Sequence, residues 1–133
     1  MIKRVDHIAS VVKNLDEAVE LYERAFGLKP ACIETLPEQG VKAALIPIGE
    51  QGEIELLEPI DAQSGVAKFL ESRGEGIHHI CLEVDDVDKE LELLAAKGVG
   101  LIDKKGRPGL AGKVGFIHPK SMKGVLIELA QKV

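Results

Sequence analysis

Two histidines and two glutamates occupy matched positions in this chain, and their side chains can bind a divalent metal ion. His79 lies 72 positions after His7, and Glu128 lies 73 positions after Glu55. Neutral imidazoles and ionised carboxylates together suit a divalent ion such as Zn, Co, Ni or Mn, and a set of four leaves coordination positions open for water or substrate oxygens. The residue types therefore predict a metal centre and leave the identity of the metal open.

The four residues belong to an internal repeat. Residues 5–8 correspond to residues 77–80, residues 14–17 to residues 86–89, and residues 54–56 to residues 127–129, the last pair being one residue out of register. A single loop insertion explains that shift, and the repeat as a whole indicates duplication of a small module. A pseudo-twofold axis between two such modules would bring each residue and its copy to equivalent places in a sheet. We therefore expect the two imidazoles and the two carboxylates to converge.

A structural role is the alternative for each of these residues. A histidine in a strand is more often a hydrogen-bonded core residue than a metal ligand. Glu128 lies in the apolar run 125–130, where an unpaired carboxylate costs several kcal/mol. A positive group must therefore face Glu128, and it is either a metal ion or one of the nearby lysines, Lys120 or Lys123.

The neighbouring histidine is a second alternative, because adjacent strand residues point to opposite faces and only one of His78 and His79 can reach the centre. We choose His79, since it is the repeat mate of His7. His118, which precedes Pro119, is expected to cap the end of a strand rather than to act at the site.

Hydrophobic periodicity predicts the order strand, helix and three strands in each module. The first module has strands over 5–12, 31–35, 41–48 and 53–58 and a helix from 15 to 26; the second has strands over 77–84, 99–103, 114–118 and 125–130 and a helix over 87–97. Asn14 and Asp86 are the expected N-caps. A short amphipathic helix over 64–72 joins the modules.

These elements predict an α+β fold in a single domain. Two βαβββ modules, about 1–60 and 76–133, would lay their strands into a curved eight-stranded mixed sheet with the helices outside, because each helix has one apolar face that the sheet can cover. A chain of 133 residues buries about 68% of its unfolded surface, which suffices for a core without disulfides.

Composition restricts the class of function. The net charge of −5 and the absence of tryptophan argue against nucleic-acid binding. Cys32 and Cys81 are interpreted as buried small hydrophobic residues of a protein in a reducing compartment. The sequence has no apolar run long enough for a signal peptide or a membrane span. We therefore expect a soluble, cytoplasmic protein that does not contact membranes.

The chain resembles the vicinal oxygen chelate superfamily, whose paired βαβββ modules carry metal ligands on the first and last strand of each copy. Within it, three segments are similar to the methylmalonyl-CoA epimerase family: residues 37–41 (PEQGV), residues 76–80 (GIHHI), and His118-Pro119-Lys120 followed by residues 124–129 (GVLIEL). The resemblance covers almost the whole chain. It implies the vicinal oxygen chelate fold, a homodimer, and an isomerase of propionate metabolism that interconverts (R)- and (S)-methylmalonyl-CoA.

The resemblance also implies a site and a reaction. The metal would be held by His7, Glu55, His79 and Glu128, with cobalt the first metal to test and Zn, Ni or Mn as alternatives. It would chelate the thioester and carboxylate oxygens of the acyl-CoA substrate and stabilise the enolate formed when the α-proton leaves.

Epimerisation needs a proton carrier on each face of the α-carbon. We expect Glu128 to serve one face, and Glu55 or an unassigned group to serve the other. Some epimerases carry a glutamate where this chain has Ala43, which leaves the second base open. Three residues before the last strand could donate to the substrate carboxylate or to coenzyme A phosphates, with solvated surface charge as the alternative role: Lys120, Ser121 and Lys123.

Three other functions share the fold or the ligand types. Lactoylglutathione lyase (glyoxalase I) has a closely similar ligand set, so fold and ligands do not decide between the two. The segment from His118 to Val125 favours the epimerase, since glyoxalases usually have an acidic turn there. A metal-free small-molecule binding module is the second rival, and metal content would exclude it. An extradiol dioxygenase uses two histidines and one glutamate, and Glu55 is one carboxylate too many.

Overall fold

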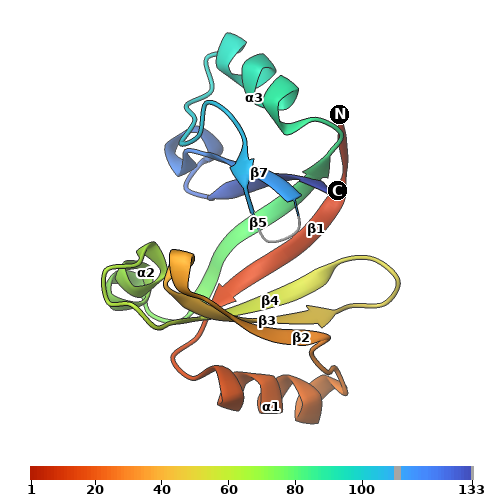
Figure 1. Cartoon of the computed structure of the whole chain (residues 1–133), viewed down its shortest axis with the longest axis vertical. Helices are drawn as coiled ribbons and strands as arrows, with labels where there is room; N and C mark the ends of the chain where they lie inside the picture. The colour runs from red at the N-terminus through yellow and green to blue at the C-terminus, as the bar shows by residue number, and fades with distance from the viewer. Residues whose placement is uncertain (110–111, 133) are drawn as a thin grey trace. The chain divides into compact units, whose positions relative to one another are not determined.

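The computed structural model describes residues 1–109 and 112–132, and the chain folds there into eight strands, three α-helices and two short 3-10 turns (Figure 1). The strands are β1 Ile2–Val11, β2 Cys32–Leu36, β3 Val41–Pro47, β4 Glu53–Pro59, β5 Gly76–Val84, β6 Arg107–Pro108, β7 Gly112–Ile117 and β8 Ile127–Lys132. The helices are α1 Leu15–Phe26, α2 Gly65–Arg73 and α3 Val87–Ala96, and the turns are η1 Pro37–Gln39 and η2 Pro119–Met122.

The strands form a mixed sheet in the order β2-β3-β4-β1-β5-β8-β7-β6. β1 pairs with β4 and β5 pairs with β8 in parallel, whereas β2, β3 and β4 and likewise β6, β7 and β8 are antiparallel neighbours. The first strand of each repeat is thus the parallel neighbour of the last strand of the same repeat. The predicted α+β fold with an eight-stranded mixed sheet is confirmed.

The chain divides into two compact units. The α1 unit comprises residues 7–78, and the α3 unit comprises residues 1–6 together with the chain from His79 onward. The boundaries cut β1 after Asp6 and β5 after His78, so both strands contribute to both units. This division places His7 with Glu55 in one unit and His79 with Glu128 in the other. That the modules about 1–60 and 76–133 form one domain stays a prediction.

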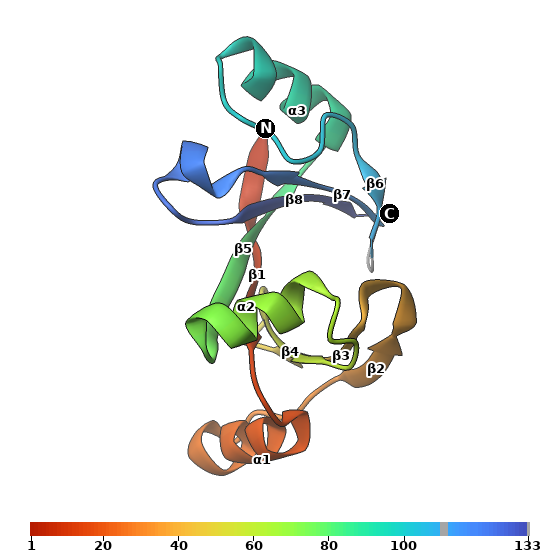
Figure 2. The ribbon, with the colours of Figure 1, turned by 90° about the vertical axis from the view of Figure 1, so that its left-hand side faces the viewer.

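In the α1 unit, helices cover both faces of the sheet. α1 packs on one face against a fully buried cluster of Leu15, Ala44, Ile46 and Leu56. On the other face, Val66 of α2 packs against a second buried cluster of Ala9, Val41, Ala43 and Leu57. Figures 1 and 2 show α1 and α2 on opposite sides of β3 and β4. The alternation of side chains along each strand separates the two clusters.

In the α3 unit, α3 covers one face of the sheet. The cluster beneath α3 contains Val84, Val87, Leu91, Ile117 and Leu129. The contact is close, because a Cβ added at Gly115 would lie 2.8 Å from Leu91 Cδ1. A glycine on β7 therefore lets α3 approach the sheet directly. The opposite face carries a small buried cluster of Cys81, Val114 and Ala130.

The predicted helix caps are present. Asn14 Oδ1 accepts from the Glu17 backbone N–H at 3.0 Å, and Asp86 Oδ1 accepts from the Lys89 N–H at 3.1 Å. Gly27 ends α1 in the left-handed conformation, with φ 71°. These local signals need only short-range hydrogen bonds, which explains why the sequence predicted them well.

The strand predicted at 99–103 is wrong. In that segment Leu101 forms only an isolated bridge with Ile117, and the sixth strand is Arg107–Pro108, paired with β7. Val99 and Leu101 instead pack into the core beneath α3. The backbone N–H groups of Ile102 and Asp103 both donate to Phe116 O, at 2.9 and 3.2 Å, so they do not continue a ladder.

The two cysteines differ. Cys81 is fully buried, as expected, but Cys32 is only half-buried. Burial is the main cause that raises the pKa of the Cys32 thiol, with the charges of Glu34 and Glu53 adding to it. A thiol with a raised pKa is a weak nucleophile at neutral pH, so Cys32 is not a candidate for covalent catalysis.

The packing beneath α3 makes a testable prediction about two leucines on that helix. Leu91 is 0% exposed, whereas Leu93 is 47% exposed. Leu91→Ala should lower the free energy of unfolding by about 2–5 kcal/mol, because it removes buried methyl groups and leaves a cavity. Leu93→Ala should change it by less than about 0.5 kcal/mol. Urea denaturation followed by circular dichroism measures both, and equal losses would contradict this placement of the helix.

Candidate active site

His79 and Glu128 lie side by side on the face of the sheet opposite α3. Their Nε2 and Oε1 atoms are 3.0 Å apart, and the residues are 5% and 8% exposed. Cys81 is the strand partner of Glu128 across the parallel pair β5 and β8, and His79 is two residues before Cys81, on the same face. The carboxylate of Glu128 therefore faces an imidazole.

The lysine alternative for Glu128 is not realised. Lys120 and Lys123 are exposed, and neither makes an ion pair within residues 1–109 and 112–132. Ser121 Oγ accepts from the Gly100 N–H at 2.7 Å, and His118 Nδ1 accepts from the Lys120 N–H at 3.1 Å. His118, directly after β7, therefore caps the turn η2, and the hydroxyl oxygen of Ser121 accepts a hydrogen bond from the neighbouring loop. The substrate contacts of Lys120, Ser121 and Lys123 stay predictions.

His7 and Glu55 form the corresponding pair in the α1 unit, on the face opposite α1. His7 Nε2 is 3.8 Å from Glu55 Oε1, and the two side chains are 14% and 11% exposed. Ala9 is the strand partner of Glu55, and His7 is two residues before Ala9. The register is the same as in the α3 unit, so the duplicated sequence produces the same local arrangement twice.

Each pair by itself can supply one nitrogen and one oxygen to a metal ion. Ligand atoms about 2.0–2.2 Å from a divalent ion lie roughly 3–3.5 Å from each other. The 3.0 Å separation of His79 and Glu128 fits that range, and the 3.8 Å separation of His7 and Glu55 needs to shorten by a few tenths of an ångström. The donor atoms and their low exposure therefore suit a bound cation.

The competing histidine contacts a different element. His78 stacks edge-on against Phe69 of α2, with ring centroids 5.0 Å apart. His79, the next residue, is the one that lies beside Glu128. The alternation of side chains along β5 therefore places the two histidines in different surroundings. His79, the histidine that the sequence repeat indicates, is the one that lies next to a carboxylate.

An aromatic ring lies beside the His79–Glu128 pair, and the sequence did not predict it there. Phe116 lies opposite Glu128 across β7 and β8, and its ring meets the His79 imidazole edge-on at a centroid distance of 5.6 Å. The Arg107 guanidinium lies 5.3 Å from the Phe116 ring centroid. In the first module, Leu45 takes the corresponding place opposite the glutamate, so the repeat gave no signal for an aromatic ring.

A buried ion network precedes His7 in the chain. Asp6 is only 4% exposed and contacts Lys132 Nζ at 2.7 Å and Arg4 Nη2 at 3.2 Å. Arg4 Nε also donates to Glu83 Oε1 at 2.8 Å. These contacts belong to the α3 unit and tie β1 to β5 and β8. They fix the backbone immediately before His7, whose position no local cap controls.

Asp88 of α3 contacts the residue before β6 and the second residue of β7. Asp88 Oδ1 accepts from the Gly106 N–H at 2.7 Å, and Oδ2 accepts from Lys113 Nζ at 2.8 Å. The hydrogen bond from Lys113 is the main cause that lowers the pKa of Asp88, and the same bond raises the pKa of Lys113.

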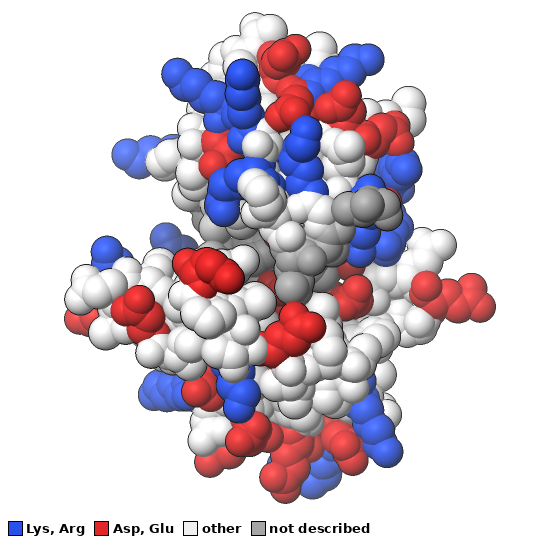
Figure 3. All heavy atoms as spheres, in the orientation of Figure 1, with Lys and Arg blue, Asp and Glu red and all other residues white. Residues whose placement is uncertain are grey.

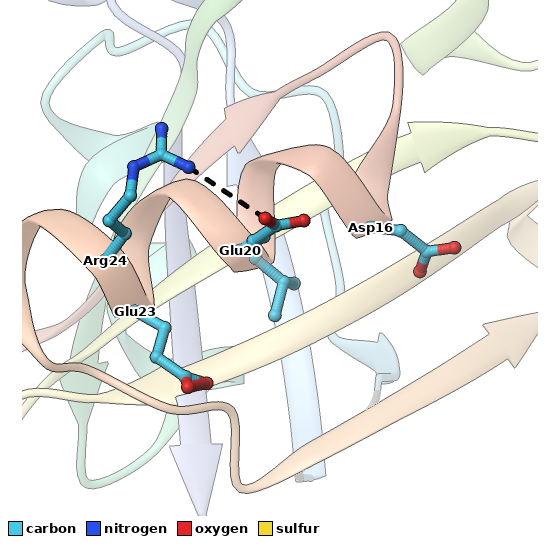
Figure 4. A pocket seen from close by; sticks show the side chains of 5 residues that line it. Asp16, Glu20, Glu23 and Arg24 are labelled. Carbon is cyan, nitrogen blue, oxygen red and sulfur yellow. Dashed lines mark ion pairs between the residues drawn. The ribbon is translucent and has the colours of Figure 1, made fainter.

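A surface hollow over α1 contains none of the predicted site residues. It is lined by Asp16, Val19, Glu20, Glu23 and Arg24, all on the one helix (Figure 4). Glu20 and Arg24 form an ion pair at 3.9 Å, and acidic side chains gather over α1 in the space-filling view (Figure 3). A hollow on a single solvated helix face lacks the converging groups of a binding site.

Comparison with known proteins places this geometry in a family. Residues 6–117 match the model of the Glyoxalase/Bleomycin resistance protein/Dioxygenase superfamily. The chain belongs to this superfamily. It is 41% identical to the mitochondrial methylmalonyl-CoA epimerase of Dictyostelium discoideum over 133 residues, covering 98% of this chain and 80% of that protein. The superfamily assignment accounts for the repeated strand and helix order described above.

Solved structures agree with the assignment. A variant of the Streptomyces coelicolor methylmalonyl-CoA epimerase in complex with 2-nitronate-propionyl-CoA matches with a TM-score of 0.94 and 36% identity, covering 100% of this chain and 96% of that one. A probable chloroplastic lactoylglutathione lyase of Arabidopsis thaliana is 27% identical, and the match covers 98% of this chain but 36% of that protein. The similarity to the epimerases is therefore the higher of the two.

The Asp88–Lys113 pair makes a testable prediction about pH. The carboxyl pKa of Asp88, measured by NMR titration, should lie below its ordinary value of 3.8 and should rise in Lys113→Met. Because the folded-state pKa is lowered, the pair stabilises the fold fully above that ordinary value and loses this contribution as the pH falls through the lowered value. Lys97→Met, at the opposite end of α3, is the control and should leave the Asp88 titration unchanged.

Proposed function

We infer that this protein is an isomerase that interconverts the two epimers of methylmalonyl-CoA. The observation that carries the inference is its similarity, over almost the whole chain, to methylmalonyl-CoA epimerases, together with a fold that matches a structure of such an enzyme in complex with an acyl-CoA compound. The same reaction is what the buried carboxylates of the site can perform, since it requires only removal and return of one proton.

We propose His7, Glu55, His79 and Glu128 as the metal ligands. Each histidine is the neighbour of its glutamate in its own unit, and in both pairs the histidine lies two residues before the strand partner of the glutamate. A divalent ion bound by these groups would supply Lewis-acid stabilisation of the negative charge that develops on the thioester oxygen. Cobalt is the first metal we would test, followed by zinc, nickel and manganese.

The proton carriers we propose are Glu128 and Glu55. Both are only 8% exposed, and a carboxylate oxygen can accept a proton and return it. Ala43 offers no base at the position where some epimerases have a glutamate, since its side chain is a methyl group packed against Ala9 and Leu57. Glu55 is a buried carboxylate on the face that carries that cluster.

The remaining expectations concern partners and location. We propose an acyl-CoA thioester as the substrate, a homodimer as the assembly, propionate metabolism as the setting, and the cytoplasm as the compartment. No helix among the described residues is long and apolar enough to cross a membrane. Lactoylglutathione lyase is the alternative function. It rests on the similarity to the Arabidopsis protein, which is lower than the similarity to the epimerases.

The decisive experiment follows the α-proton of the substrate. The cobalt-loaded protein, mixed with one epimer of methylmalonyl-CoA in D2O, should cause rapid loss of the α-proton NMR signal, and chelator treatment should stop the loss. A signal that persists while the glutathione hemithioacetal of methylglyoxal is consumed would establish the lyase instead. If neither compound reacts and the protein retains no metal, the binding-module alternative replaces both enzymes.

Glu128→Gln tests the proposed proton carrier. The amide keeps the volume of the side chain but cannot accept the proton, so exchange at the α-carbon should fall by at least about 100-fold. Metal content measured by elemental analysis shows whether the loss reflects the ligand or the base. Glu20→Gln, on the exposed face of α1, is the matched control. Exchange at the wild-type rate in Glu128→Gln would remove Glu128 from the mechanism.

A further inference from the structure

Arg107 places a cation on the same face of the α3 unit as His79 and Glu128. On this face the strands follow the order β5, β8, β7 and β6, with Phe116 opposite Glu128 and Val114 opposite Arg107. Arg107 therefore belongs to the edge strand β6, and its guanidinium lies over Phe116, 5.3 Å from the ring centroid.

A single aromatic ring contacts both this cation and the imidazole. Phe116 lies against the Arg107 guanidinium and meets His79 edge-on at 86°. The ring is partly buried, so it excludes water from one side of the guanidinium. A cation above an apolar ring and beside solvent binds an anion more strongly than a fully hydrated cation does.

Asp103 binds both Arg107 and the strand that carries Phe116. Its Oδ1 accepts from Arg107 Nε at 3.1 Å, and its Oδ2 accepts from the Phe116 backbone N–H at 2.9 Å. One carboxylate thus fixes both the guanidinium and the strand that carries the ring. The side chain of Asp103 is 16% exposed, whereas that of Arg107 is 50% exposed. The anchor is mostly buried and the cation remains accessible.

The contact with Asp103 leaves most of the donors of Arg107 available. A guanidinium has five N–H groups in a planar fork that matches carboxylate and phosphate oxygens. Only Nε is used by Asp103, and within residues 1–109 and 112–132 no second acidic group pairs with Arg107. The two terminal nitrogens can therefore donate together to an anion that arrives from solvent.

We propose that Arg107 binds an anionic oxygen group of the acyl-CoA substrate. This inference rests on the proposed function, because that function supplies a substrate with anionic groups: the free carboxylate of the acyl part and the phosphates of coenzyme A. Both offer the paired oxygens that a guanidinium recognises, and a comparison of substrates separates them.

Arg107→Gln and Arg107→Lys test the proposal with two substrates. Methylmalonyl-CoA carries the carboxylate and the phosphates, whereas methylmalonyl-pantetheine carries the carboxylate alone. The loss of a charged hydrogen bond should raise KM by about tenfold or more in Arg107→Gln, with a smaller rise in Arg107→Lys, which keeps the charge and loses the fork. The kcat should change little. Rates come from α-proton exchange in D2O.

A matched control exists elsewhere in the chain. Arg24 forms the same i, i+4 pair with an acid, Glu20, on the exposed face of α1, so Arg24→Gln removes an equivalent surface ion pair and should leave KM unchanged. Metal content and thermal unfolding, measured for every variant, show whether the His79 side of the site is intact. An effect of Arg107 through packing alone would lower these two values rather than change KM selectively.

The outcomes are distinct. A KM increase with both substrates assigns Arg107 to the carboxylate, and an increase with methylmalonyl-CoA alone assigns it to a phosphate of coenzyme A. An unchanged KM with both substrates, in an enzyme that epimerises them, overturns the proposal and leaves the proposed function standing. Absence of exchange in the wild-type protein would instead overturn the proposed function.

Discussion

An ionised carboxylate that leaves water must gain a positive charge or hydrogen bonds, because its burial otherwise costs several kcal/mol. Both repeats satisfy this requirement in the same way. In each, a histidine on the first strand lies beside a glutamate on the last strand. Glu128 and His79 are 3.0 Å apart, and Glu55 and His7 are 3.8 Å apart. Each pair also offers one imidazole nitrogen and one carboxylate oxygen at low exposure, and these donor atoms suit a metal cation.

The pairing register of the strands places each histidine beside its glutamate. In both repeats the first and last strands are parallel neighbours, and the histidine lies two residues before the strand partner of the glutamate. The helix of each repeat covers the opposite face, where the side chains are apolar. Because side chains alternate along each strand, the face covered by the helix of that repeat is apolar and the opposite face carries the histidine and the glutamate. A shift of the strand register by one residue would exchange the two faces.

The surroundings of the two pairs differ. In the α3 unit, Phe116 lies beside His79, Arg107 lies over the Phe116 ring, and Asp103 binds both Arg107 and the Phe116 backbone. In the α1 unit, the corresponding face carries Ala43 among apolar residues and is covered in part by α2. The two copies of the repeat therefore have a charged and an apolar neighbourhood.

The sequence by itself determined the caps at Asn14 and Asp86, the helices and most strands, because these depend on short-range hydrogen bonds and periodicity. Its internal repeat also identified which histidine and glutamate occur together in each copy. Only the tertiary structure placed β6 at Arg107–Pro108, since Val99 and Leu101 follow the core beneath α3 rather than a ladder. It alone brought Phe116 beside His79, with Arg107 and Asp103 in contact with Phe116, because those contacts join segments whose proximity no local pattern encodes.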